Sequence, residues 1–329
     1  MNSHTPWITG IGSVSPFGVV AGPIPTRTIE PRAIAAWPTG GLRRAYLVNP
    51  FRAGDAVPGL KTRRLDRLSV WSLVAASLAV KDAGLDLDGA DRSRVAVVFA
   101  TGLGCIELTE AYFRSALHNG WPGVDPIVFP ETLCSAPASH VARCLDLRGP
   151  NVTASCKGLG GECALLQAAS LVRNGQADFA VVLAGDTLTR SAYEWYEAAG
   201  ALSPACFDAE PRGDRPGLVP SEGVVALVME SAEHRQRRNA RGYAAVRSGH
   251  LAAKAEMGDA IRKALCGRAL SEVALIAAAD SSPVAQGLGD AAGMLRLALA
   301  LSAPPPGALA VLASTAASGA SAALLLELP

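Results

Sequence analysis

The apolar and polar positions between residues 149 and 186 follow the order strand, turn, helix and strand. Val152–Cys156 is short, apolar and partly β-branched, which is typical of a strand in a covered sheet. Lys157–Gly161 holds three glycines, so the backbone there can turn sharply. Cys163–Val172 is apolar nearly all round and predicts an interior helix, and Phe179–Ala184 predicts a second buried strand. A residue at such a strand-to-helix turn lies at the positive end of the helix, where folds of this kind keep a nucleophile.

The rest of the chain repeats this alternation of buried strands and helices. A strand beginning at Trp7 runs into a Gly/Ser/Pro turn, and apolar runs with helical spacing then alternate with short, fully apolar runs. The alternation predicts an α/β protein that repeats its rhythm in a second, smaller half. We expect helices at Leu68–Val80, Cys105–Leu117 and Ser231–Arg241, strands at Arg94–Ala100 and Val224–Met229, and a further strand from Tyr243.

Composition and charge exclude several classes of function. Half of the 329 residues are hydrophobic and 5% are aromatic, so a large core of Ala, Leu and Val is expected. The net charge of +1 argues against nucleic-acid binding and a membrane-surface role. Seven scattered cysteines without a CxxC pair suit buried thiols in a reducing cytosol better than disulfides or zinc. The glycine-rich turn Thr101–Gly104 lacks the Lys-Ser/Thr of a phosphate loop. We expect a cytoplasmic protein without metal or cofactor, and without signal peptide or membrane span.

Short motifs frame the strand–turn–helix unit. They are GPN at 149–151, GQAD at 175–178 and AGD at 184–186. These motifs resemble the nucleophile region of the β-ketoacyl synthases, the condensing enzymes of the thiolase-like superfamily. WITGIGSVSPFG at 7–18 and EGVVALVMESAEHRQRRNARGYAAV at 222–246 resemble other motifs of that family.

The resemblance implies a fold and a division of the chain. The fold is α/β and thiolase-like, with two similar βαβ halves in a layered α-β-α-β-α arrangement and a shortened second half. We expect an N-terminal half with insertions over residues 1–240. The shortened C-terminal half would cover residues 241–329.

The nucleophile position departs from the family pattern. Counted from either flanking motif without gaps, the family's cysteine falls on Gly158. Cys156 lies two residues earlier, inside the expected strand, and a buried thiol in apolar surroundings is inert. The sequence therefore predicts a site without the family's nucleophile.

The family's two catalytic histidines and its gating phenylalanine are also replaced. Both histidines belong to the C-terminal half of the family, whereas the last of the five histidines in this chain is His250. The first histidine position falls on Ser282, or on Asp280 if a gap is allowed, and the second motif has no place in the shortened chain. The gate position falls on Ala317, and the asparagine of the same loop is replaced by Ser321. We expect a chain that keeps the fold without the reaction.

The resemblance is then to the chain-length factors of type II polyketide systems, which pair with an active ketosynthase. It implies a heterodimer that shapes the acyl tunnel, with an acyl carrier protein bound through the partner. The helix Cys105–Leu117 and the FPET segment at 129–132 match family segments at the dimer interface and tunnel, although an ordinary amphipathic helix fits the same pattern. The expected tunnel or interface residues are Leu108, Ala111, Tyr112, Ser115, Phe129, Thr132 and Leu133.

Two other functions stay open from the sequence. The chain could be an active acyltransferase or thioesterase-like enzyme that uses Cys156, or a stand-alone scaffold that binds a carrier protein. The basic residues Arg63, Arg64 and Arg67 could contact an acidic carrier protein, but a solvated helix start beside Asp66 fits them better. His140, inside an apolar helix, fits a satisfied core residue better than a base.

Overall fold

The computed structural model describes residues 3–34, 43–156, 158–207, 217–253, 256–277, 282–304 and 307–329, without the side chains of residues 275–277. Lys157 in the expected turn and Asp280, the gapped alternative for the histidine position, lie outside the described residues.

Five strands form the sheet of the N-terminal half: β1 (Pro6–Ser15), β5 (Val95–Ala100), β6 (Asn151–Ala154), β7 (Phe179–Asp186) and β8 (Gly223–Ser231). Their order is β6-β5-β7-β8-β1, and the short β2 (Gly18–Ala21) pairs with β1. β5, β6 and β7 run parallel, whereas β8 is antiparallel to both of its neighbours. β5, β7 and β8 are buried along their whole length, as their continuous apolar sequences predict for strands covered on both faces.

Four strands form the sheet of the C-terminal half: β9 (Ala244–Ala252), β10 (Val273–Ala277), β11 (Leu309–Thr315) and β12 (Ser321–Glu327). Their order is β10-β11-β12-β9, with β10 and β11 parallel and the other pairs antiparallel. This repeats the pattern of β5-β7-β8-β1, and the described residues contain no counterpart of β6. Two residue pairs between β1 and β9 join both sheets into one mixed sheet.

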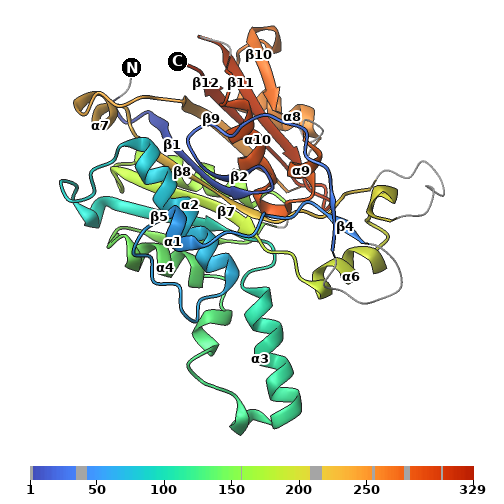
Figure 1. Ribbon diagram of the computed structural model, residues 1–329. Coiled ribbons are helices and arrows are strands. Elements are labelled where there is room, and N and C mark those ends of the chain that lie inside the picture. The colour runs from blue at the N-terminus through green and yellow to red at the C-terminus, as the bar shows by residue number, and fades with distance from the viewer. Residues whose placement is uncertain are drawn as a thin grey trace.

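Helices cover and separate the two sheets in five layers (Figure 1). α2 (Arg67–Ala83) and α4 (Ala136–Cys144) pack on the outer face of the first sheet. α5 (Gly160–Arg173) packs against β5 and β7 on one side and against β9, β12 and α10 (Ala292–Ala300) on the other. α8 (Met257–Ala264) covers the outer face of the second sheet. The layered α-β-α-β-α arrangement expected from the sequence is confirmed.

Small residues let α2 approach the sheet closely. A Cβ added at Gly12 would lie 2.2 Å from the carbonyl oxygen of Ala75, and one at Gly10 would lie 2.3 Å from that of Ala79. The first helical turn is capped by Asp66, whose side chain accepts a hydrogen bond from the N–H of Leu68 at 2.8 Å. Small side chains, rather than large aromatic ones, therefore fill the space between α2 and the sheet and allow them to pack closely.

Some expected boundaries are wrong by a few residues. The strand expected over Val152–Cys156 ends at Ala154, and the helix expected from Cys163 already begins at Gly160. The charged helix expected over Ser231–Arg241 is shorter, because α7 spans Ala232–Arg237. The remaining short elements are α1 (Ala53–Ala56), α6 (Arg190–Ala198), α9 (Pro283–Gln286), β3 (Arg32–Ala33) and β4 (Arg44–Ala45).

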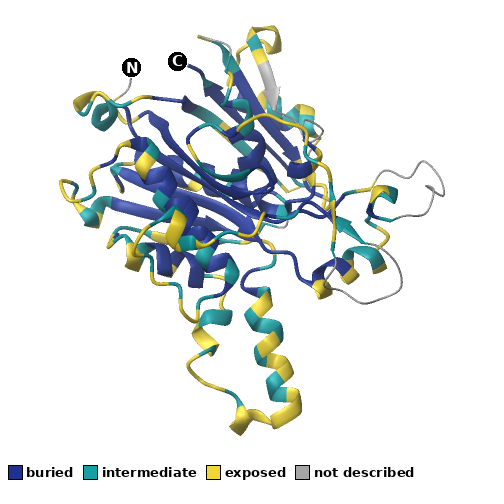
Figure 2. Cartoon of the chain, in the orientation of Figure 1, coloured by how far each residue is buried: buried dark blue, intermediate teal, exposed yellow. Residues whose placement is uncertain are grey.

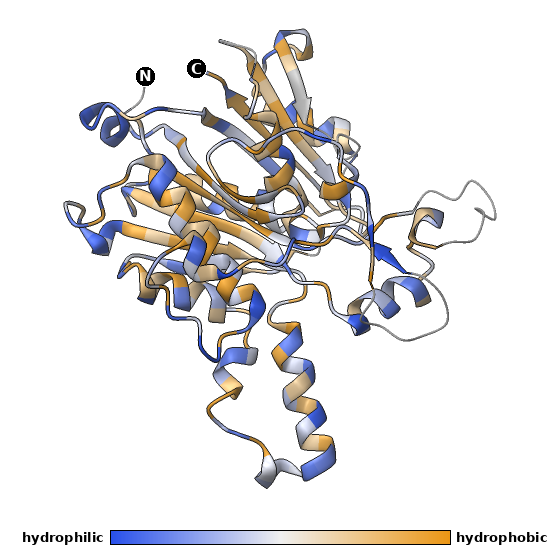
Figure 3. Ribbon diagram, in the orientation of Figure 1, coloured by the Kyte–Doolittle hydropathy of each residue, from blue (hydrophilic) through white to orange (hydrophobic). Residues whose placement is uncertain are grey.

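One segment stands apart from the core. α3 (Ile106–Asn119) has no buried residue and, with the chain that returns from it, extends away from the sheets (Figures 1 and 2). We call residues 105–135 the α3 arm. The strands, in contrast, are mostly buried and hydrophobic (Figures 2 and 3). No helix in the described part of the chain is long and apolar enough to cross a membrane.

Candidate functional site

One buried carboxylate from the C-terminal half holds the turn between β6 and α5. Asp290 lies in the short helix η7 (Gly289–Ala291) and accepts hydrogen bonds from the N–H of Cys156, at 3.1 Å, and from the N–H of Gly158. A Cβ added at Gly160 would lie only 2.7 Å from Asp290, so this approach requires glycine at the first position of α5. The turn is therefore fastened to the second half of the protein.

The backbone conformation at Gly158 defines the direction in which a side chain at the nucleophile position would point. Gly158 has a φ of +106°, which residues with a side chain rarely adopt. A Cβ added there would lie 3.5 Å from the Cβ of Ala316. Ala316 precedes Ala317, the expected gate position, which is exposed. Position 158 thus faces the loop that carries the gate in the family.

Cys156 is not where the sequence analysis expected it. Because β6 ends at Ala154, Cys156 lies beyond the strand at the turn and is only partly buried. The expectation that this thiol is buried inside a strand is therefore wrong. Its side chain packs with that of Cys163 on a small apolar cluster formed by Leu159, Ala316 and Ala322.

Ser282, the expected histidine position, has a local structural role. Its hydroxyl caps α9 by accepting a hydrogen bond from the N–H of Ala285 at 3.3 Å. It borders a cavity of about 610 Å³ whose wall includes Phe17, Tyr46 and Leu299. Gly158 and Cys156 are not part of that wall, so this cavity does not bring Ser282 to the turn.

Asp186, at the end of β7, is a buried carboxylate that the sequence analysis did not single out. It accepts hydrogen bonds from the hydroxyl of Thr101 at 2.6 Å, and from the N–H groups of Gly102 and Leu103 at 3.0 and 2.8 Å. Burial raises the pKa of Asp186 to about 6, and the negative charge of Asp290 adds to the increase. The only signal in the sequence is the aspartate that ends the motif AGD, where the family has glycine.

Asp186 and Asp290 approach each other around Gly102. A Cβ added at Gly102 would lie 3.4 Å from Oδ2 of Asp186 and 3.6 Å from Cγ of Asp290. The loop at 101–104, the turn residues Cys156 and Gly158, and the short helix η7 thus meet at two carboxylates. Within the described residues, no three His, Cys, Asp or Glu side chains gather as a metal-binding group would.

A second buried polar link joins the two halves next to this turn. Glu162 in α5 pairs with Arg296 of α10 at 3.3 Å, and the hydroxyl of Ser314 on β11 hydrogen-bonds to both. Burial raises the pKa of Glu162, whereas the hydrogen bond from Ser314 and the charge of Arg296 oppose the increase. The sequence signal for this residue is a carboxylate inside an otherwise apolar helix.

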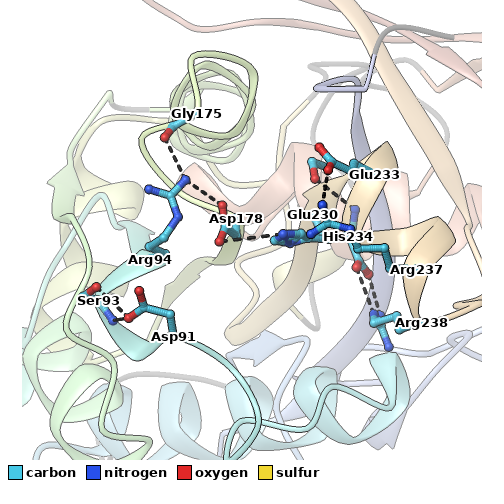
Figure 4. Close-up of polar contacts among 11 residues, drawn as sticks. Asp91, Ser93, Arg94, Gly175, Asp178, Glu230, Glu233, His234, Arg237 and Arg238 are labelled. Atoms are coloured by element: carbon cyan, nitrogen blue, oxygen red, sulfur yellow. Dashed lines mark hydrogen bonds and ion pairs between the residues drawn. The ribbon is translucent and has the colours of Figure 1, made fainter.

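Two histidines have structural partners. His140 is buried, its Nε2 lies 2.6 Å from Oε2 of Glu131, and its Nδ1 accepts a hydrogen bond from Arg143 at 2.9 Å. His234 lies 3.8 Å from Asp178 (Figure 4). It also contacts the ring of Phe179, at the start of β7. The turn with Gly158 is at the other end of the parallel strands, so His234 does not serve it.

The expected tunnel and interface residues come together on the α3 arm. Tyr112 and Phe129 contact each other with ring centroids 5.9 Å apart, and the hydroxyl of Thr109 donates to the carbonyl oxygen of Thr132 at 3.1 Å. Leu108, Tyr112, Ser115 and Thr132 are half-buried, whereas Ala111, Phe129 and Leu133 are exposed. Their role in a tunnel stays a prediction. The large apolar side chains that the arm exposes are Phe113, Leu117, Trp121, Ile127, Phe129 and Leu133.

The basic run divides into exposed and engaged residues. Arg63 and Arg64 are exposed at the surface. Arg67 pairs with Glu107 at 3.0 Å and with the buried Glu222 at 3.1 Å, and stacks on the ring of Trp71. Arg67 therefore links the start of α2 to the base of the arm and to the residue that precedes β8.

Solved structures share this fold over nearly the whole chain. A β-ketoacyl synthase from Burkholderia phymatum STM815 matches with a TM-score of 0.81 and 19% identity over 99% of both chains. The ishigamide ketosynthase/chain length factor matches with a TM-score of 0.76 and 23% identity, over 98% of this chain and 99% of that chain. A chain from the structure described as a type II PKS acyl-carrier protein in complex with its ketosynthase matches with a TM-score of 0.76 and 16% identity over 99% of both chains. The class of fold is thus the thiolase-like fold of the ketosynthases.

The sequence comparisons give the family. The model of the β-ketoacyl synthase N-terminal domain matches residues 23–235, so the chain belongs to the β-ketoacyl synthase family. The 3-oxoacyl-[acyl-carrier-protein] synthase 2 of Vibrio cholerae serotype O1 is 27% identical over 260 residues, which cover 73% of this chain and 61% of that protein. The corresponding enzyme of Staphylococcus aureus strain N315 is 28% identical over 73% of this chain and 60% of its own length. The chain spans about three-fifths of the length of these curated relatives.

Proposed function

We propose that this chain is a non-catalytic β-ketoacyl synthase-like subunit, a chain-length factor, that forms a heterodimer with an active ketosynthase in type II polyketide biosynthesis. The observation that carries the proposal is Gly158 at the nucleophile position, facing Ala316. Condensation needs a thiol that holds the acyl chain and donors that stabilise the enolate oxygen. Gly158 offers no thiol, and the nearby carboxylates of Asp186 and Asp290 oppose the development of negative charge.

The α3 arm supplies the interface in this proposal. Its exposed apolar side chains form the kind of surface that marks a protein–protein interface. In the complex they would pack on the ketosynthase and line its tunnel, and the carrier protein would bind through the ketosynthase. One structure of similar fold is described as a ketosynthase/chain length factor, which supports the assignment.

Co-expression with a tagged ketosynthase that has its cysteine and both histidines tests this proposal. We expect the two chains to purify together in equal amounts, and Leu117→Glu or Trp121→Glu in the arm to abolish this, because both side chains are exposed by 87% and 66%. Leu270→Glu is the matched control, since Leu270 is 52% exposed but lies outside the arm. A chain that stays monomeric or forms only homodimers beside the ketosynthase would instead support the stand-alone scaffold.

A second candidate function follows from the position of Cys156. Because this thiol lies at the turn and is partly exposed, it fits an acyltransferase or thioesterase-like enzyme better than a thiol inside a strand would. Incubation with an acyl-carrier thioester, followed by intact mass, tests the candidate. An added acyl mass that is present on the unmodified protein and absent from Cys156→Ala would support this second function. No added mass on the protein, even with the ketosynthase present, would exclude it.

A further inference from the structure

Two of the seven cysteines lie together beside the turn. Cys156 follows β6 and Cys163 lies in the first turns of α5. The backbone bends at Gly158, whose φ of +106° is favoured by glycine, between β6 and α5. The two side chains lie close enough for Cys156 to raise the pKa of Cys163. Both side chains also pack on one buried cluster, formed by Leu159, Ala316 and Ala322.

We propose that Cys156 and Cys163 form a redox-active dithiol that closes reversibly into an intrachain disulfide. This goes beyond the proposed subunit function and does not depend on it. Both thiols are partly exposed, so a small oxidant can reach them. Because both side chains reach the same small cluster, the two thiols lie in one place, as the closure of an intrachain disulfide requires.

The oxidant in this proposal is a low-molecular-weight disulfide. The thiolate of one cysteine attacks a sulfur of the small disulfide, which forms a mixed disulfide and releases one small thiol. The second cysteine loses its proton and attacks the protein sulfur of the mixed disulfide, which releases the second small thiol. The two protein thiols are oxidised and one small disulfide is reduced to two thiols, so atoms and electrons balance.

The surroundings of the two thiols give them different roles. Burial raises the pKa of Cys163, and its contact with Cys156 raises it further. Cys163 therefore stays a thiol at neutral pH and acts second, as the resolving cysteine. Cys156 is the one that meets the oxidant first. Replacement of Cys163 should then trap the mixed disulfide on Cys156.

The nearby pair Cys105 and Cys134 provides an internal comparison. Burial raises the pKa of Cys105 to about 12, so its reactive thiolate is rare. Cys105 is also buried, whereas Cys134 is exposed. We therefore expect oxidation to select Cys156 and Cys163 before this pair.

The disulfide can be mapped directly, because Lys157 lies between the two cysteines in the sequence. Trypsin separates Gly149–Lys157, which holds Cys156, from Gly158–Arg173, which holds Cys163. The native full-length chain is incubated with oxidised glutathione, remaining thiols are alkylated, and the digest is analysed by mass spectrometry. We expect the two peptides to remain joined until a reductant is added.

Variants separate this disulfide from general thiol reactivity. Cys163→Ser should carry one glutathione on Cys156 and form no joined peptides, whereas Cys144→Ser, at an exposed cysteine elsewhere, should leave the joined peptides unchanged. Peptide mapping of the unmodified chain tests the proposed disulfide even if a variant fails to fold. Joined peptides that form only in denaturant, or glutathione found on other cysteines while Cys156 and Cys163 stay reduced, would overturn the proposal.

Discussion

Asp186 is a buried carboxylate whose hydrogen-bond donors come from a neighbouring loop. Three donors of the loop at 101–104 surround it, and its charge is compensated by them rather than by a cation. Burial dominates, however, and raises the pKa of Asp186 to about 6. At the residue scale, Asp186 is therefore largely ionised at neutral pH and places a negative charge near Asp290.

This carboxylate predicts a pH dependence of stability. The folded protein keeps the proton of Asp186 to a higher pH than the unfolded chain, where the pKa of aspartate is about 3.9. The contribution to the free energy of unfolding is thus largest below about pH 4 and is lost as the pH rises through about 6. Asp186→Asn removes the titration, so the stability of the unmodified protein relative to Asp186→Asn should fall by roughly 2 kcal/mol between pH 4 and 7.

Urea unfolding of both proteins at several pH values measures this difference. Thr101→Val is a useful companion variant, because removing its hydroxyl should raise the pKa of Asp186 and move the loss of stability to higher pH. A difference that does not change with pH would contradict the prediction.

Gly158 predicts a cost for any side chain at the nucleophile position. Gly158→Ala should lower the free energy of unfolding by about 1–3 kcal/mol, because its φ of +106° strains a residue with a Cβ. The nearest neighbour, Ala316, is at ordinary contact distance, so the cost is conformational and not a clash. Gly54→Ala in α1 has a normal φ and no atom within 4 Å, and it should change stability by less than about 0.5 kcal/mol. Equal urea midpoints for the two variants would count against this account.

At the scale of elements, α5 is held by polar groups as well as by apolar packing. Glu162 of α5, Arg296 of α10 and Ser314 of β11 form a buried link across the central layer. Burying these charged groups costs desolvation free energy, which is offset only when all three partners are present. It also fixes which face of α5 meets the second sheet.

Removing one partner of this link should be worse than removing both. Arg296→Met leaves the charge of Glu162 buried without its cation and should cost about 3–5 kcal/mol. The double variant Glu162→Leu/Arg296→Met should cost less than Arg296→Met alone, and hence less than the sum of the single changes. A double-mutant cycle by urea unfolding tests this, and additive values would show that the two residues do not act together.

Local hydrophobic patterns predict most of the helices and strands. The features that the sequence does not predict depend on contacts between residues far apart in the chain. The strand expected over Phe179–Ala184 and the helix expected over Leu68–Val80 lie inside β7 and α2, because their apolar patterns need no distant partner. The bonds from Asp290 to the turn join residues 132 and 134 positions apart, and no local signal reveals them. Cys156 was misplaced for the same reason, since β6 ends where the turn begins its contact with Asp290.

At the scale of the molecule, the two halves share one interior. α5 belongs to the first half by sequence, but it packs against β9, β12 and α10 of the second. The strands of both halves also continue into one sheet through β1 and β9. The division that the sequence predicts at residue 240 stays a prediction, and we do not expect it to separate units that fold alone.

Expression of residues 1–240 without the second half tests this view. The fragment keeps β1, β5–β8 and α2 but leaves the inner face of α5 without its cover, so we expect no cooperative unfolding transition in urea. The full chain should unfold in one transition by both tryptophan fluorescence and far-UV circular dichroism. Adding residues 241–329 as a separate peptide should restore the transition if the shared layer is the cause. A fragment that unfolds cooperatively with the stability of the full chain would show instead that the first half is independent, and that α5 does not need the second sheet.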